Sequence, residues 1–257
     1  MWLLTALFGN SRADAQLLSI VANRAGTVSD VQQLLARGAD PNAPDYRDKA
    51  REGYEGQIAL HYAATWHEPD RGDLVRLLLK AGADPSIRSR FGHTPLHYFA
   101  LYGGIAEIGE LLDAGADLNA FNKVGHTPLH YAAANAQVEA ARVLLERGAD
   151  PNSNRPKKIR RWGGDTPILM AVSHQTNIEP RLEVMKLLIC KGAHLTKIGD
   201  GTETALDKAK VWLESKKKHH PDEEDRERSI INLERIISLL ERESSSVSDG
   251  ISVSDTQ

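Results

Sequence analysis

The sequence is poor in cysteine: Cys190 is the only one among 257 residues. A single cysteine excludes an intrachain disulfide and a metal site built on a cysteine framework. The apolar run VMKLLIC that contains it predicts a small, buried thiol. A reducing compartment suits such a chain, so we expect a cytoplasmic protein. A nuclear location, secretion and delivery into a host cell stay open.

Aromatic residues, long apolar runs and an excess of one charge are also missing. Phe, Trp and Tyr make up 5% of the chain, so the core must be built mainly from Leu and Ala. The formal net charge of −3 gives the whole chain no general attraction to nucleic acid or anionic membranes. No stretch reaches the roughly 18 apolar residues of a membrane span. The start, MWLLTALF, lacks a basic residue before its apolar run, which favours a capping segment over 1–13 rather than a signal peptide.

Sequence signatures of catalysis are absent as well. The chain has no nucleophile elbow, no glycine loop that could cradle a phosphate and no HExxH. No Asp or Glu stands in a context that argues for a perturbed pKa. We therefore expect a protein that is not an enzyme and that uses neither a cofactor nor a metal.

What the sequence does contain is an internal repeat. The tetrapeptide TPLH begins at Thr94 and again at Thr127, 33 residues later. The phrase GAD, or GAH in its last copy, begins at Gly38, Gly82, Gly115, Gly148 and Gly192, at intervals of 44, 33, 33 and 44 residues. A fixed period of this length indicates a repeat architecture in which each unit stacks on the next.

The chemistry within one repeat predicts two helices. The hydroxyl of Thr94 can cap a helix, and Pro95 suits the first helical position because no donor is lost there. A short helix then runs to Gly103, and a second helix ends at Gly115, where glycine readily takes a left-handed conformation. One helix pair cannot bury its own apolar face, so neighbouring pairs must bury it jointly.

The segments GHTPLHYFALYGGIAEIGELLDAGADLNA and GHTPLHYAAANAQVEAARVLLERGADPNS resemble the ankyrin family almost throughout. A weaker copy replaces Thr-Pro by Ile58-Ala59, and another replaces the His by Leu169. The resemblance implies an all-α solenoid of about six helix-turn-helix units with β-hairpin-like fingers, the first and last acting as caps. The predicted units are 14–43, 44–86, 87–119, 120–152, 153–196 and 197–243. The Ser-rich remainder, 244–257, is expected to be disordered.

The ankyrin resemblance also implies where a partner would bind. In that family the contact residues follow the Ala-Ala of the inner helix and flank the glycine of each finger, on a concave surface. At the ends of the inner helices the matching residues are Trp66, Leu101, Tyr102, Asn135, His174 and Trp212. In the fingers they include Tyr54, Arg90, Phe91, Lys123 and Trp162. Trp and Tyr are frequent at binding hot spots, but Trp66 and Trp212 could instead pack against the neighbouring insertions.

The basic segment PKKIRRW distinguishes this chain most from a generic family member. Lys157, Lys158, Arg160 and Arg161 lie beside an aromatic residue, a pattern that fits a polyanion or an acidic partner. A solvated loop is an equally good interpretation. We expect a protein-binding scaffold that is monomeric on its own. Nucleic-acid or polyanion binding through 156–162 is the alternative function.

The resemblance assigns two further sets of residues. It implies a structural role for His61, His97 and His130, which would bond the backbone of the neighbouring turn rather than a metal. It also marks Asn42, Asn119 and Asn152 as positions that an asparaginyl hydroxylase modifies in eukaryotic ankyrin fingers. The second repeat, 44–86, has Ser86 at this position and could not react.

Overall fold

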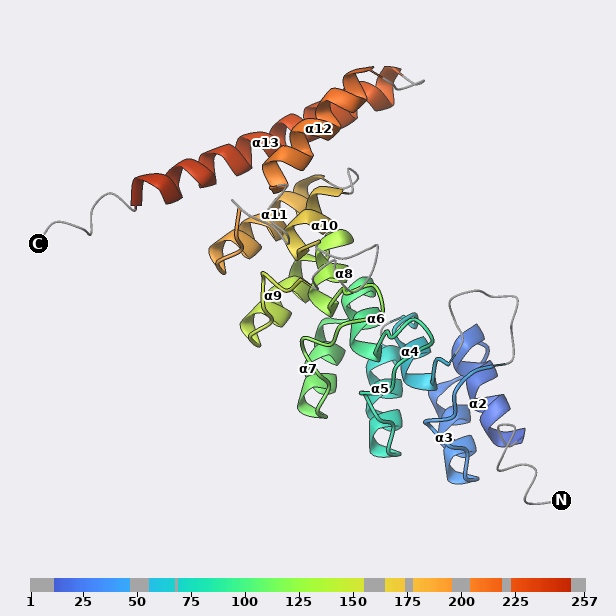
Figure 1. Cartoon of the computed structure of the whole chain (residues 1–257). Helices are drawn as coiled ribbons and strands as arrows, with labels where there is room; N and C mark the ends of the chain where they lie inside the picture. The colour runs from blue at the N-terminus through green and yellow to red at the C-terminus, as the bar shows by residue number, and fades with distance from the viewer. Residues whose placement is uncertain are drawn as a thin grey trace, which may run out of the picture. The chain divides into compact units, whose positions relative to one another are not determined.

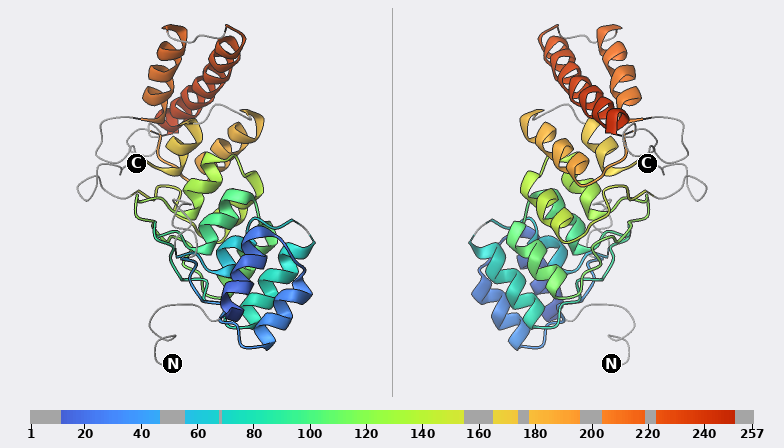
Figure 2. Two further views of the ribbon diagram at one scale, coloured as in Figure 1. Left: turned by 90° about the vertical axis from the view of Figure 1, so that its right-hand side faces the viewer. Right: turned by 90° about the vertical axis from the view of Figure 1, so that its left-hand side faces the viewer.

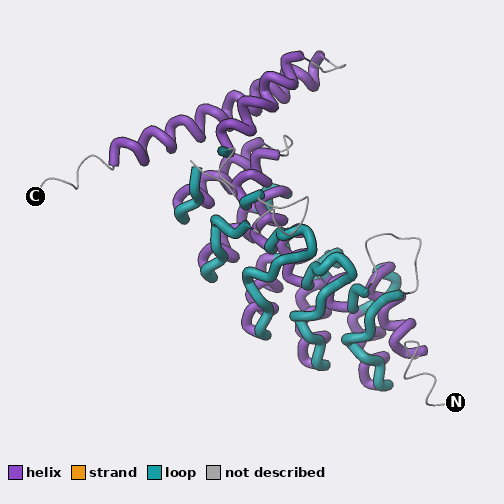
Figure 3. The backbone as a smooth tube through the Cα atoms, viewed as in Figure 1, coloured by secondary structure: helices purple, strands orange, loops and turns teal. Residues whose placement is uncertain are grey.

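The computed structural model of the chain describes residues 12–46, 56–67, 69–154, 165–173, 178–195, 204–218 and 223–250. It divides into two compact units, Met1–Lys123 and Val124–Gln257, each of which is described by itself. Helices and the loops between them account for nearly all of the described residues (Figures 1 and 3).

The described residues of the first unit form three successive helix pairs. The pairs are α2 (Arg12–Asn23) with α3 (Val28–Ala36), α4 (Ala59–Ala63) with α5 (Asp70–Lys80), and α6 (Pro95–Tyr102) with α7 (Ile105–Asp113). The inner helix α4 contacts α2 and α6, and the outer helix α5 contacts α3 and α7. The loops between pairs gather on one side of these helices (Figure 2). This sequential stacking confirms the predicted all-α repeat fold for this unit.

The second unit repeats the arrangement with longer final helices. Its pairs are α8 (Pro128–Ala134) with α9 (Val138–Glu146), α10 (Pro167–Ser173) with α11 (Ile178–Cys190), and α12 (Ala205–Lys218) with α13 (Glu223–Gly250). The inner helix α10 contacts α8 and α12, and the outer helix α11 contacts α9 and α13. Each unit is therefore a short solenoid whose pairs abut in chain order.

Two predictions about the chain ends have different outcomes. The capping segment 1–13 lies mostly outside the described residues, which begin with α2 at Arg12. The expectation of disorder from residue 244 is wrong for 244–250, because α13 continues to Gly250. The hydroxyls of Ser244 and Ser245 donate to the carbonyls of Leu240 and Glu241, four residues earlier, so these serines are accommodated within the helix.

The glycine at the end of an outer helix follows the prediction, whereas Thr94 begins α6 without a side-chain cap hydrogen bond and its Oγ1 lies 2.9 Å from His97 Nδ1. Thr27 and Asp30 form a reciprocal cap at the start of α3, with Thr27 N donating to Asp30 Oδ2 at 2.8 Å and Asp30 N to Thr27 Oγ1 at 3.2 Å. Gly115 closes α7 at φ +93°, a conformation that favours glycine. Leu and Ala dominate the buried core, as expected from the low aromatic content.

The prediction that Cys190 is buried is wrong, because its side chain is exposed at the end of α11. The apolar run suggested burial, but the repeat register gives the correct answer. Cys190 stands two residues before Gly192, and the residues two before Gly82, Gly115 and Gly148 are Lys80, Asp113 and Glu146, all exposed. The outward face of an outer helix therefore accepts almost any side chain at this position.

Arg181 is a buried arginine that the sequence gave no reason to expect. Its Nη1 donates to the carbonyls of Ala134 at 3.2 Å and Ala171 at 2.9 Å, near the ends of α8 and α10. Removal from water lowers the pKa of its guanidinium to about 10, so it keeps its charge at neutral pH. Arg71 occupies the same register in the first unit, since both arginines precede the closing glycine (Gly82 or Gly192) by 11 residues.

Candidate partner-binding surface

The fingers of the first unit are held together by backbone hydrogen bonds. Ser89 N donates to His93 O at 2.8 Å and closes the third finger, which opens the third repeat, 87–119. Lys123 N donates to Phe91 O at 2.9 Å and joins the third finger to the fourth, which opens the repeat 120–152. Arg88 Nη1 strengthens this junction by donating to Phe121 O at 2.6 Å. The backbone of Phe91 is therefore fixed while 41% of its side chain stays exposed.

Two of the repeated histidines, His61 and His130, connect their inner helix to the finger that follows. His61 Nδ1 accepts from Ile58 N at 3.1 Å, so the ring proton lies on Nε2, which donates to His93 O at 3.0 Å. His130 behaves in the same way in the second unit: its Nδ1 accepts from Thr127 N at 3.0 Å and its Nε2 donates to Asp165 O at 2.9 Å. The structural role that the family resemblance implied is thus observed for these two rings.

Burial keeps both of these rings neutral. Loss of hydration lowers the pKa of His61 to about 4 and that of His130 to about 3, although the bonds to the carbonyls of His93 and Asp165 act in the opposite direction. His97 shares the local geometry, since Thr94 N donates to its Nδ1 at 3.1 Å. Within the described parts of the chain, no group of three His, Cys, Asp or Glu residues is placed to hold a metal ion.

The finger asparagines bridge successive turns. Asn42 donates from Nδ2 to Gly82 O at 2.8 Å, and its Oδ1 accepts from Asp84 N at 2.8 Å. Asn152 repeats this pair of bonds with Gly192 O and His194 N, at 2.9 and 2.7 Å. The amides of these two candidate hydroxylation sites are therefore engaged in bonds between turns, although both residues are half-exposed. Asn119, the third candidate, also makes contacts, including Asn119 N to Asp117 Oδ1 at 3.0 Å.

The predicted contact residues of the first unit separate into buried and exposed ones. Trp66 departs from the expectation, because only 5% of it is exposed and its Nε1 donates to Val21 O at 2.8 Å. It belongs to the packing of the first two helix pairs and is not an exposed anchor. Tyr102, by contrast, is 47% exposed at the end of α6, and Leu101 beside it is half-buried.

In the second unit the predicted contact residues are more polar or partly covered. Asn135 is exposed, and its amide donates to Tyr131 O at 2.9 Å. Trp212 is half-buried on α12, and Lys208 Nζ lies 5.3 Å from the centre of its ring, within reach of a cation–π contact. The same ammonium group is 3.2 Å from Asp165 Oδ1. A partner that used the face of Trp212 would compete with Lys208.

Several predicted residues lie outside the described part of the chain. These are Tyr54, His174, Trp162 and the basic patch of Lys157, Lys158, Arg160 and Arg161. In the third and fourth fingers, Arg90 and Lys123 are exposed. Of the predicted contact residues in the first unit, the structure therefore leaves Tyr102 and the finger residues around Phe91 exposed.

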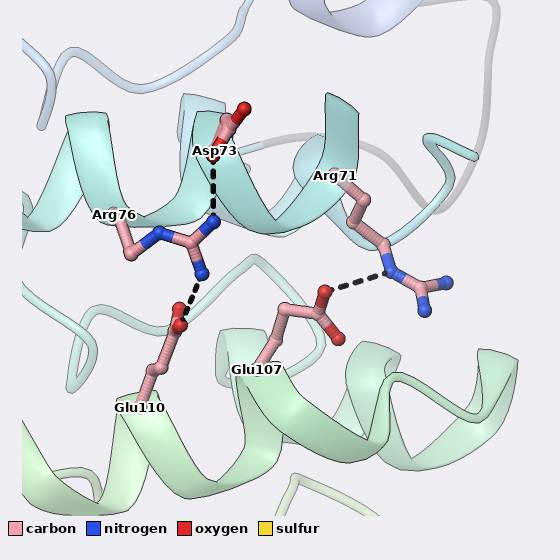
Figure 4. A network of polar contacts seen from close by, with 5 residues as sticks. All are labelled: Arg71, Asp73, Arg76, Glu107 and Glu110. Atoms are coloured by element: carbon pink, nitrogen blue, oxygen red, sulfur yellow. Dashed lines mark hydrogen bonds and ion pairs between the residues drawn. The ribbon is translucent and has the colours of Figure 1, made fainter. Parts of the chain in front are cut away.

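The outer helices of the first unit carry a charged network that sequence reasoning missed (Figure 4). Arg71 Nε lies 3.3 Å from Oε1 of the buried Glu107, which joins α5 to α7. Arg76 donates to Asp73 at 2.6 Å and to Glu110 at 2.7 Å, and these two hydrogen bonds raise the pKa of its guanidinium. These ion pairs connect the adjacent outer helices α5 and α7, so we assign them to the stacking of the repeats.

Comparison with known proteins agrees with this geometry. Residues 60–155 match the family model described as ankyrin repeats in three copies. The 2-5A-dependent ribonuclease of Mus musculus is 42% identical over 82 residues, which is 32% of this chain and 10% of the ribonuclease. The aligned part of the chain thus spans about a tenth of the length of that relative.

The stacked pairs, the glycine-closed outer helices and the histidine bonds define a helical repeat protein of the ankyrin type. Together with the family match, they identify residues 60–155 as ankyrin repeats. Such repeats are generally protein–protein interaction modules. None of the helices described is long and apolar enough to cross a membrane.

Proposed function

We propose that the chain is a non-enzymatic scaffold that binds a partner protein through the fingers and the ends of the inner helices. The exposure of Tyr102 carries the proposal, because its neighbours on α6, such as Phe99 and Ala100, are fully buried. A large aromatic side chain that is 47% exposed on a rigid helix is poorly explained by stacking. It suits a hot spot, since Tyr buries a large area at low entropic cost.

Phe91 extends this surface to the finger. It precedes α6, whereas Tyr102 ends that helix, whose eight residues are about 12 Å long. Each partner contributes roughly 800 Å² to a standard interface, a patch roughly 30 Å across, which is wider than a helix of this length. Arg90 and Lys123 surround Phe91 with positive charge, which favours a partner segment that combines apolar and acidic residues.

The absence of catalytic sequence motifs supports the non-enzymatic part of this proposal. The named relative is a ribonuclease, but the aligned part of the chain is only a tenth of it. That likeness is therefore compatible with a shared binding module and supplies no reason to assign ribonuclease activity.

Alanine substitutions with a matched control test the surface. A partner is first identified by affinity capture, and its dissociation constant is then measured with purified components. Phe91→Ala combined with Tyr102→Ala should weaken binding by more than about tenfold, because loss of a hot-spot residue costs roughly 2 kcal/mol or more. Ile105→Ala is the control: Ile105 is equally exposed, at 46%, but begins the outer helix α7.

The pattern of losses decides the question. Intact binding by the double variant, or an equal loss in Ile105→Ala, would place the interface elsewhere and overturn the proposed surface. Circular dichroism of each variant checks that its helical content is unchanged.

A further inference from the structure

The long helix α13 has an outward face that takes no part in the apolar packing of the second unit. We call it the α13 outer face, and all of its members are exposed: Glu227, Arg228, Ile231, Glu234, Arg235, Ser238, Glu241, Arg242 and Ser245. The opposite side of the helix, including Leu233, Ile236 and Leu240, is buried. In the second unit α13 lies against α12 and α11 (Figure 1).

The α13 outer face carries a seven-residue charge repeat. The dipeptide Glu-Arg begins at 227, 234 and 241. Seven residues turn the chain by about 700°, only about 20° short of two full turns. The three glutamates therefore form one stripe and the three arginines a second, parallel stripe. Ile231, Ser238 and Ser245, which are also seven residues apart, lie between the two stripes.

This charge repeat is not one that stabilises a single helix. Oppositely charged side chains support a helix when they are three or four residues apart, but within the repeat Glu and Arg are separated by one, six or eight residues. Arg235 instead pairs with Glu179 of α11 at 2.6 Å, and Glu241 pairs with Lys210 of α12 at 2.8 Å. Among the described residues, Glu227 and Glu234 make no ion pair.

A groove runs beside these stripes. It has a volume of about 450 Å³ and is lined by Leu182 and Lys186 of α11 and by Ile231, Glu234, Arg235, Ser238, Leu239 and Arg242 of α13. Leu182 and Leu239 provide an apolar floor, and Ile231 is 56% exposed at one end. Ile231 and Ser238, which lie between the two charged stripes, thus also line the groove. The small Ser238 side chain allows another backbone to approach closely.

We propose that a second copy of this chain packs on the α13 outer face, with the two α13 helices parallel about a twofold axis. That symmetry places the glutamate stripe of one copy against the arginine stripe of the other, along both edges of the contact. An antiparallel pair would bring glutamate against glutamate and arginine against arginine. The charge pattern is therefore self-complementary in one orientation only. The proposal departs from the monomer expected from the sequence.

The molar mass of the full chain, measured by light scattering or sedimentation, tests the proposal. Between about 1 µM and about 1 mM, a range that covers weak associations, the wild-type mass should rise from one chain toward two. Added salt should shift this transition to higher concentration, because the exposed pairs are screened. A mass of one chain at every concentration would overturn the proposal.

Two charge-reversed variants locate the contact. One changes the three arginines of the repeat to Glu, and the other changes its three glutamates to Arg. Each should dimerise at least about tenfold more weakly than wild type, because like charges then face each other. An equimolar mixture should form a heterodimer, which also shows that neither variant has simply lost its fold. Unchanged dimerisation of either variant, or no association in the mixture, would refute the assignment.

Two substitutions and a crosslink test whether the two α13 helices meet along the row of Ile231, Ser238 and Ser245 (the seam), and whether they are parallel. Ile231→Asp should weaken the dimer at least about tenfold, because it places carboxylates in the seam. The control Val211→Asp should not, although Val211 is 62% exposed on α12. In a Cys190→Ser background, Ser238→Cys should form an intermolecular disulfide on oxidation, because a parallel twofold brings this position against itself. Equal effects of the two aspartates, or no disulfide, would contradict the proposed packing.

Discussion

Acidification should destabilise the folded chain by weakening the hydrogen bonds that His61 and His130 make between repeats. The rings of His61 and His130 are neutral in the folded chain, with pKa values lowered to about 4 and about 3 by burial, from an ordinary value of 6.5. Both native pKa values are depressed, so the unfolded chain binds more protons than the folded one below pH 6.5. Their stabilising contribution is therefore complete above that pH and is lost progressively as the pH falls toward 4 and 3.

The size of the effect follows from these values. A pH of 5 lies 1.5 units below the pKa of 6.5 of the unfolded ring, which is therefore protonated, while the folded ring is still neutral. A pKa difference of 1 corresponds to about 1.4 kcal/mol. Between pH 7.5 and pH 5, each ring therefore lowers the free energy of unfolding of the compact unit that contains it by about 2 kcal/mol. For a unit of this size, that loss lowers the melting temperature by on the order of 10 °C.

Urea or thermal unfolding at several pH values between 5 and 7.5 measures this dependence, and leucine variants isolate each ring. Leucine is a realistic replacement because Leu169 occupies the same register in the fifth repeat, three residues after Thr166. His130→Leu should cost about 1–3 kcal/mol at pH 7.5, since it removes two buried hydrogen bonds. It should also reduce the pH dependence by about 2 kcal/mol. A variant with the wild-type slope between pH 5 and 6.5 would refute the reasoning.

Four further predictions concern individual contacts. Thr127→Val should destabilise the chain by about 1–2 kcal/mol in urea unfolding, because it removes the hydroxyl that lies 2.8 Å from His130 Nδ1. Thr166→Val should be neutral or stabilising in the same titration, because the buried Thr166 hydroxyl has no partner among the described residues. Arg181→Met should cost about 1–3 kcal/mol in urea unfolding, since it leaves backbone carbonyls of the inner helices unsatisfied, and a cost near zero would contradict the role assigned to that side chain. Asn152→Ala should cost about 1–2 kcal/mol by the loss of two turn-bridging bonds, and an unchanged unfolding midpoint would show that the amide is dispensable. If the basic residues of 157–161 bind a polyanion, neutralising them should abolish heparin binding and its salt dependence, and a salt-independent affinity would exclude that function.

The repeat architecture was predictable because its signals are local. The spacing of the GAD phrases, the Thr-Pro caps and the closing glycines all act within a few residues of where they stand. The role of His61 followed from the family pattern for the same reason, since its bonds reach only its own helix cap and the next finger. The exposure of Cys190 could also have been predicted by comparing register positions rather than by the apolar run around it.

Other features depended on contacts that the local sequence does not reveal. Trp66 is buried because Val21, 45 residues earlier, presents its carbonyl to the indole. Arg181 is buried because carbonyls from two inner helices converge on its guanidinium, although Arg is almost never fully buried without such partners. The continuation of α13 past residue 243 could not be anticipated from composition, because serine-rich segments usually favour disorder.

The fifth repeat shows that stacking does not require the same bonds in every unit. Leu169 replaces the histidine, so Thr166 loses the ring nitrogen that Thr127 uses, and the bond from a histidine Nε2 to the following finger is missing. Other contacts surround the same junction: Arg181 joins α11 to the ends of two inner helices, and Lys208 of α12 reaches back to Asp165. These contacts come from long side chains that span a repeat, whereas the histidine contact depends on one fixed ring geometry. The junction can therefore tolerate change in its fingers, and this unit also carries the inserted basic segment that distinguishes the chain from a generic ankyrin-repeat protein.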